Sequence, residues 1–136
     1  MTKTIQGVVS KAQTLILAAC PSILSAPEYA TDARLDKTSI AYPTNIQYKT
    51  RSDFANILFD LKIEVKIGRK DLKDAMQFLM PLPEQICTAI AADPTIGGTC
   101  QTYGGSDKPI TCNLVTENVN GMVTIGWEIT VPDVKI

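Results

Sequence analysis

The sequence predicts an α+β fold, in which helices pack on one face of a mixed, mainly antiparallel sheet and the chain closes with a C-terminal β-hairpin. Three observations predict it. Apolar residues follow a helical period near the N-terminus, a strict alternation runs through residues 57–67, and Asn120-Gly121 separates two β-prone stretches. A chain of 136 residues is long enough to bury its own core, so residues 1–136 are expected to form a single domain.

The first twenty residues have the pattern of an amphipathic helix, which Pro21 ends. Its apolar face holds Ile5, Val8, Val9, Ala12, Leu15, Ile16 and Ala19, and the polar residues Lys3, Gln6, Ser10, Lys11, Gln13 and Thr14 fall mostly elsewhere. The letters "LILAAC" before Pro21 have the look of a lipoprotein processing site, but polar residues interrupt the apolar stretch that a leader needs. We therefore favour the helix, and we expect no membrane-spanning segment.

A long stretch without a sustained period follows, at about 21–44, with three prolines and many small residues. Such a connection is either a functional loop ordered by a partner or, as the alternative, an irregular helix around 26–35. Residues 45–50 alternate weakly and predict a short strand, which turns at 51–53 into the next one.

Residues 57–67 predict one long strand with an apolar face and a charged face. The apolar face carries Ile57, Phe59, Leu61, Ile63, Val65 and Ile67, and the opposite face carries Asp60, Lys62, Glu64 and Lys66. At about 3.3 Å per residue, the strand would extend roughly 36 Å, well beyond the usual five or six residues.

Two short helices, or one kinked helix, are predicted after Gly68, because the apolar period changes there and Pro81 and Pro83 interrupt it. Pro83 suits a first helical turn, and so does the acidic Glu84. In the last strand, one face carries Val123, Ile125, Trp127, Ile129 and Val131, and the opposite face carries Thr124, Gly126, Glu128 and Thr130. The phase of Trp127 predicts a core residue, with an interface anchor as the alternative.

Composition argues against several functions. The net charge is −1 and charged residues are moderate in number, which argues against disorder and against a general basic surface for nucleic acids. Histidine, the usual acid/base side chain and the commonest metal ligand, is absent. The sequence therefore does not favour an enzyme, and no metal or cofactor is expected. The four cysteines show no C-x-x-C spacing and are expected to be reduced, with a Cys100–Cys112 bridge as the rival.

Four further stretches carry a resemblance to a known family. They are "YPTNIQY" (42–48), "ILFDLKIEVKI" (57–67), "ADPTIGGTC" (92–100) and "GWEITVPDV" (126–134). Together with the N-terminal helix, and in this order, they resemble the tail terminator, or tail completion, proteins of long-tailed bacteriophages. The resemblance covers nearly the whole chain, apart from the 21–44 loop and residues 103–109.

The resemblance implies a structural virion protein rather than an enzyme. It implies a homo-oligomeric ring, typically a hexamer, at the head-proximal end of the tail tube, assembled in the host cytoplasm. The ring would end tube polymerisation, present a surface to the head-side connector or stopper protein, contact the tail tube protein, and let DNA pass without specific binding. Another head-to-tail connector or neck ring protein, or a tail tube subunit, is the alternative, and a small enzyme is a more remote one.

The charged face of the long strand is the candidate channel or subunit-interface face. Its candidate residues are Asp60, Lys62, Glu64, Lys66, Arg69, Lys70 and Glu128. Alternating signs give this face little net field, as a DNA conduit requires, but the same pattern is typical of an ordinary solvated strand. An enzyme would have to use carboxylates such as Asp60 and Glu64.

Two other short patterns are open to more than one interpretation. Arg69, Lys70 and Lys73 would form a basic cluster, or a helix start neutralised by neighbouring aspartates. Gly97-Gly98 fits a phosphate loop less well than a tight turn, because no Gly-Lys-Ser/Thr follows.

Overall fold

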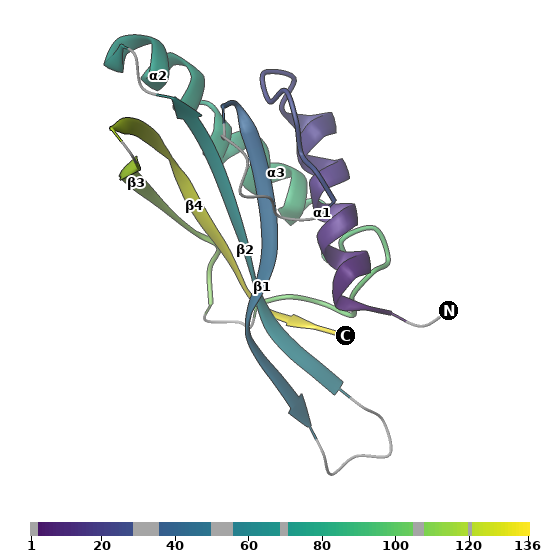
Figure 1. Cartoon of the computed structure of the whole chain (residues 1–136). Coiled ribbons are helices and arrows are strands. Elements are labelled where there is room, and N and C mark those ends of the chain that lie inside the picture. The colour runs from purple at the N-terminus through teal and green to yellow at the C-terminus, as the bar shows by residue number, and fades with distance from the viewer. Residues whose placement is uncertain (1–2, 29–35, 50–55, 69–70, 105–107, 120) are drawn as a thin grey trace.

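The computed structural model describes residues 3–28, 36–49, 56–68, 71–104, 108–119 and 121–136. Its elements are α1 (Ile5–Ala19), β1 (Thr38–Lys49), β2 (Asn56–Gly68), α2 (Leu72–Leu79), α3 (Leu82–Ala91), β3 (Thr111–Val119) and β4 (Met122–Lys135). The described strands form one antiparallel sheet in the order β1-β2-β4-β3, and the helices lie on one side of it (Figure 1). The predicted α+β class and the C-terminal hairpin are confirmed.

The N-terminal helix forms where the apolar period predicted it. Thr4 caps α1, since its Oγ1 accepts a hydrogen bond from the backbone N–H of Gly7 at 3.0 Å. The helix ends at Ala19, just before Pro21, and its apolar face is buried against the sheet and α3.

Gln13 is not on the solvent side of α1, where its polar character had placed it, but is only 2% exposed. Its Nε2 donates to the carbonyl oxygens of Ser39 at 2.8 Å and Pro27 at 2.9 Å, and its Oε1 accepts from Ser39 Oγ at 2.9 Å. Because every polar atom of this amide has a partner, its burial is tolerated. The Gln13–Ser39 pair thus ties α1 to β1.

The predicted loop over 21–44 is too long at its C-terminal end, because β1 already begins at Thr38. Pro43 was taken as part of an irregular stretch, yet it pairs with Leu61 inside the strand. β1 is an edge strand whose outer side is bridged at its start by Ser25, and a proline is accommodated farther along because no described strand pairs with that side. The alternative helix over 26–35 falls mostly on residues outside the described part, as does the predicted turn at 51–53.

The core lies between the sheet and the helices and is built on the apolar face of β2. Its side chains Phe59, Leu61, Ile63, Val65 and Ile67 are buried together with Ile125, Ile129 and Val131 of β4. Ile57 and Trp127 pack against this core but are only partly buried. The predicted phase of both strands is therefore confirmed.

The two helices after β2 are separate, and their ends are secured by side chains. Asp71 caps α2, with Oδ1 accepting from the N–H of Lys73 at 3.1 Å, and Pro83 and Glu84 lie in the first turn of α3. At the C-terminal ends, Trp127 Nε1 donates to the carbonyl of Leu79, and the Tyr103 hydroxyl donates to that of Ile90, both at 2.7 Å. The Trp127 bond gives a partner to a carbonyl at the end of α2 and fixes α2 to β4. The Tyr103 bond, to a carbonyl that also accepts from the N–H of Asp93, ties α3 to the segment that follows it.

Candidate channel and subunit-interface surfaces

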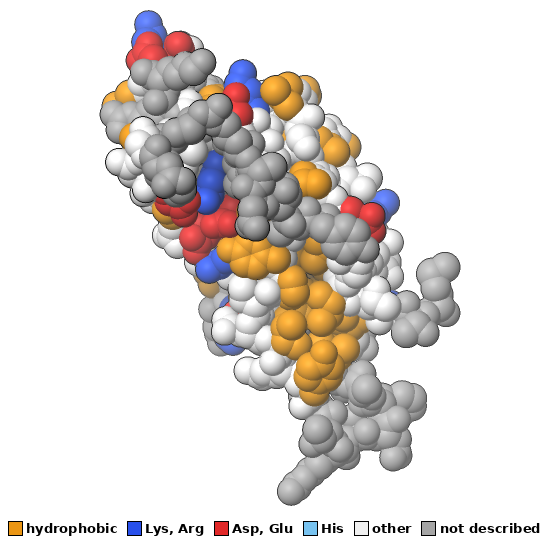
Figure 2. Space-filling model, in the orientation of Figure 1, with side chains coloured by type: hydrophobic (Ala, Val, Ile, Leu, Met, Phe, Trp, Pro, Cys, Tyr) orange, Lys and Arg blue, Asp and Glu red, His pale blue; other side chains and the backbone are white. Residues whose placement is uncertain are grey.

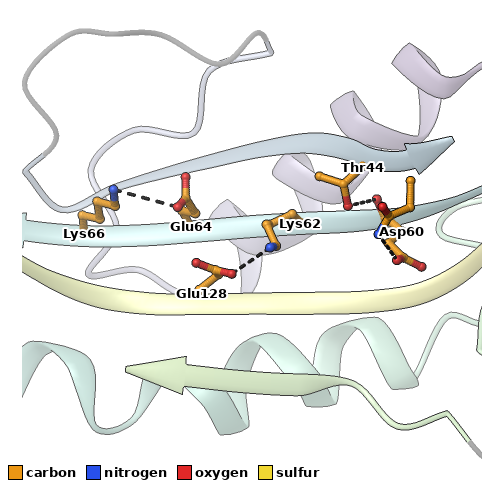
Figure 3. A network of polar contacts seen from close by, with 7 residues as sticks. Thr44, Asp60, Lys62, Glu64, Lys66 and Glu128 are labelled. Carbon is orange, nitrogen blue, oxygen red and sulfur yellow. Dashed lines mark hydrogen bonds and ion pairs between the residues drawn. The ribbon is translucent and has the colours of Figure 1, made fainter. Parts of the chain in front are cut away.

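The charged side chains of β2 lie on the sheet face opposite the helices. Figure 3 shows Lys62, Glu64 and Lys66 projecting from this face of β2, with Glu128 of β4 beside them and the helices behind the sheet. In register, Glu64 pairs with Glu128, and Lys62 and Lys66 flank them along β2. We call this side of the sheet the polar face. The candidates Arg69 and Lys70 lie outside the described residues.

The lysines of the polar face are held by glutamates. Lys62 Nζ lies 2.7 Å from Glu128 Oε1, and Lys66 Nζ lies 2.8 Å from Glu117 Oε2 and 3.9 Å from Glu64 Oε1. The Lys66 and Glu64 side chains are only 14% and 15% exposed, so water screens their attraction incompletely. Two lysines and three glutamates thus form two adjacent groups, Lys62 with Glu128 and Lys66 with Glu64 and Glu117. We call them together the charge network, and it has no excess of positive charge.

Glu117 belongs to this network, although it was not among the candidate residues predicted from the sequence. It lies on β3 opposite Thr124 of β4, in the register that pairs Val119 with Met122. Counting outward from the turn places Glu117 on the same face as Thr124 and Glu128, so the signal was present in the sequence.

Tyr42 of β1 contacts the network from the other side of β2. It lies opposite Lys62 in the sheet register and its hydroxyl bonds to the Glu64 carboxylate. Burial, and then the charge and hydrogen bond of Glu64, raise the pKa of Tyr42 to about 12. The neutral phenol and the Lys66 ammonium therefore both contact the Glu64 carboxylate.

Asp60 is separate from this network and has a structural role. Its Oδ2 accepts from Asn45 Nδ2 at 2.9 Å, and its Oδ1 accepts from the backbone N–H of Asp133 at 3.1 Å. Asn45 and Asp133 have φ values of 53° and 49°, in the left-handed region that asparagine and aspartate tolerate best. Register shifts between Thr44 and Gln47 and between Phe59 and Leu61 place irregularities on both sides of Asp60. Its carboxylate therefore stabilises the bend of both neighbouring strands.

The Gly97-Gly98 stretch is a self-bonded turn. Asp93 Oδ2 accepts from the N–H of Gly97 at 2.7 Å, and Thr95 Oγ1 accepts from the N–H of Gly98 at 3.1 Å. The glycine φ values of 67° and 81° require this residue type. Donors that would cradle a phosphate are thus used within the loop, which favours the tight turn.

A second candidate surface was not predicted. The paired ends of β1 and β2 form a hairpin arm, which we define by residues 45–49 and 56–57 (Figure 1). This arm runs past the end of β3 and reaches the last residues of β4, where Leu58 pairs with Lys135. Tyr48 and Ile46 on this arm are 63% and 42% exposed. Figure 2 shows hydrophobic side chains gathered above the end of the molecule that carries the arm, while acidic and basic groups lie side by side farther up. The arm thus presents apolar side chains beyond the cover of the helices.

The described part of the chain offers little for other classes of site. No group of three or more metal-binding side chains occurs among the described residues, and none of the described helices has the length and apolar character to cross a bilayer. A shallow, open groove between α1 and α3 is lined by Ala19, Glu84, Gln85, Thr88 and Ala89. No protein-family model matches this sequence, and no curated protein matches it either.

Proposed function

We propose that this protein is a phage tail terminator: a structural subunit that forms a ring, most simply a hexamer, at the head-proximal end of a tail tube. The proposal starts from the resemblance of the sequence to that family. One observation carries it further, namely a long sheet with one face covered by helices and the other carrying a self-neutralised network of charges. In this role the protein is not an enzyme, and it acts through its surfaces.

The polar face suits the wall of a DNA conduit. Tight electrostatic binding to DNA requires lysines and arginines that displace counterions from phosphates. Lys62 and Lys66 are instead paired with glutamates at 2.7 and 2.8 Å. Phosphates passing such a wall would meet paired lysines and an excess of carboxylates, so DNA would move through without being held.

The hairpin arm suits the contact between ring subunits. A ring closes by head-to-tail contacts in which two different patches of each subunit meet. Tyr48 and Ile46 are exposed apolar side chains on an element that projects from the body, so a neighbouring subunit would remove them from water. The tail tube protein and a head-side connector or stopper protein would then contact the two rims of the ring.

The test is a tube-assembly reaction in which tail tube protein polymerises with and without this chain, followed by electron microscopy. We expect shorter tubes that carry a ring of density at one end. Incorporation along the tube would identify a tube subunit, binding only to the head-side vertex would identify another neck component, and no association with either would contradict the proposal.

A matched pair of variants tests the arm. Tyr48→Ser is expected to weaken ring formation, because Tyr48 is an exposed apolar side chain on the arm. Met80→Ser is the control, since Met80 is also 63% exposed but lies between α2 and α3. Equal ring formation by both variants, measured by analytical ultracentrifugation, would remove the arm from the subunit contact.

A further inference from the structure

Two cysteines that are distant in the sequence meet in the structure. Cys87 lies within α3 and Cys112 lies at the start of β3, and their Sγ atoms are 3.7 Å apart. This separation is van der Waals contact between sulfurs, and one thiol hydrogen-bonds to the other. The rival Cys100–Cys112 bridge considered from the sequence is not the pairing that the structure favours.

The other two cysteines have different surroundings. Cys20 and Cys100 are both fully buried, and the Cys100 thiol points to the carbonyl of Pro94 at 3.9 Å. Cys87 and Cys112 are instead only partly buried, so they are the more accessible two of the four cysteines. Access and proximity therefore coincide only at this pair.

We propose that Cys87 and Cys112 form a redox-responsive pair, which becomes an intramolecular disulfide on reaction with a low-molecular-weight disulfide such as oxidised glutathione. The proposal does not depend on the ring function. A disulfide needs an S–S distance of about 2.0 Å, so the sulfurs must approach by about 1.7 Å. We expect rotation of the two side chains to supply this movement.

The proposed exchange consumes one small disulfide and releases two small thiols. One protein thiolate attacks the small disulfide and releases one small thiol, which leaves a mixed disulfide on the protein. The second protein sulfur attacks the protein sulfur of that mixed disulfide and releases the second small thiol. The two cysteines lose two electrons and two protons, and the reagent gains them as two thiols.

The reaction is expected to be slow and to leave the thiols intact in a reducing medium. Burial, followed by the hydrogen bond and charge of Cys112, raises the pKa of the Cys87 thiol to about 12. Since the thiolate is the attacking species, few Cys87 sulfurs react at neutral pH at any moment. The two sulfurs are thus close enough to become linked, but attack by Cys87 is slow.

The disulfide would fasten α3 to the edge strand β3. It would close the chain between residues 87 and 112, which contains the Asp93 turn and the connection to β3. Cross-linking a loop of this length restricts the unfolded chain, and the expected rise in Tm is roughly 5 to 15 °C.

The test treats the folded full-length protein with oxidised glutathione, blocks free thiols, and digests with a protease that cleaves before aspartate. The digestion places Cys87, Cys100 and Cys112 in separate peptides, 74–92, 93–106 and 107–132. We expect a disulfide-linked pair of the first and third peptides. A link from 93–106 to either neighbour, intermolecular dimers, or free thiols throughout would overturn the proposal.

Two variants and one denatured control complete the test. Cys112→Ser should abolish both the link and the rise in Tm on oxidation, whereas Cys20→Ala should retain both. The unfolded chain in denaturant should give mixed pairings, because proximity no longer selects one. A folded protein that gives the same mixture as the unfolded chain, or a Cys112→Ser variant that still gains stability on oxidation, would contradict the inference.

Discussion

The two faces of β2 are held by different forces. On the helix side, Phe59, Leu61, Ile63 and Val65 are at most 1% exposed, and their contribution is the removal of apolar surface from water. On the polar side, Lys62 and Lys66 are held by glutamates and keep 26% and 14% exposure. One face of β2 therefore stabilises the fold, and the other face is the one that a partner would contact.

This difference predicts that mutations on the two faces separate stability from assembly. Each buried aliphatic side chain contributes more to folding than a partly exposed ion pair, which is worth about 0–1 kcal/mol. The polar face can therefore change its charge at small cost to the fold.

Leu61→Ala should give the largest loss, because Leu61 is 0% exposed in the centre of the core. We expect about 2–5 kcal/mol from lost transfer free energy and the remaining cavity, measured by urea denaturation. Leu58→Ala is the matched control, since Leu58 belongs to the same strand but lies on the polar face and is only partly buried. Equal losses in the two variants would show that the faces are not distinct.

Ser39→Ala tests the buried Gln13–Ser39 pair on the helix side. Ser39 is 0% exposed, and the variant removes the hydroxyl that donates to Gln13 Oε1 at 2.9 Å. The buried amide oxygen would be left without that partner, so we expect a loss of about 1–3 kcal/mol. Thr14→Ala, which removes a solvent-side hydroxyl bound to the Ser10 carbonyl, should cost clearly less in the same denaturation measurement.

Lys62→Gln should change stability by only about 0–1 kcal/mol, because its pair with Glu128 is partly exposed. The double variant Lys62→Gln with Glu128→Gln isolates the coupling, and high salt should reduce it. A loss comparable with that of Leu61→Ala would mean that the polar face determines folding, contrary to the comparison.

Tyr42 gives the most local readout of the polar face. Its pKa is raised to about 12, chiefly by burial and then by Glu64, so the unfolded chain loses this proton before the folded protein does. The contribution of Tyr42 to stability is therefore complete below about pH 10 and disappears as the pH rises through about 12. Glu64→Gln should lower the Tyr42 pKa in a spectroscopic titration, and an unchanged midpoint would exclude the Tyr42–Glu64 contact.

Periodicity was sufficient to predict both faces of β2, the amphipathic α1 and the hairpin at Asn120-Gly121. These features depend on local spacing, which the sequence contains directly. The charge network was predicted in part, because Lys62, Glu64, Lys66 and Glu128 share one phase. Asp60 shares that phase as well, but its bonds to Asn45 and Asp133 depend on strand irregularities that spacing does not reveal.

The remaining features depend on contacts between distant parts of the chain. The burial of Gln13 depends on Ser39, and the approach of Cys87 to Cys112 depends on how α3 packs beside β3. Gly126 is a further case, because a Cβ there would collide with the backbone carbonyl of Val65. The alternating pattern places Gly126 on the polar face, but only the sheet shows that no side chain fits.

We propose that this two-faced sheet forms the wall of a ring around a channel. Electron microscopy of the purified protein, alone and with tail tubes, tests it most directly. We expect closed rings with a central hole wide enough for duplex DNA, bound at one end of the tube. Particles that stay monomeric even in the presence of tube ends would contradict it.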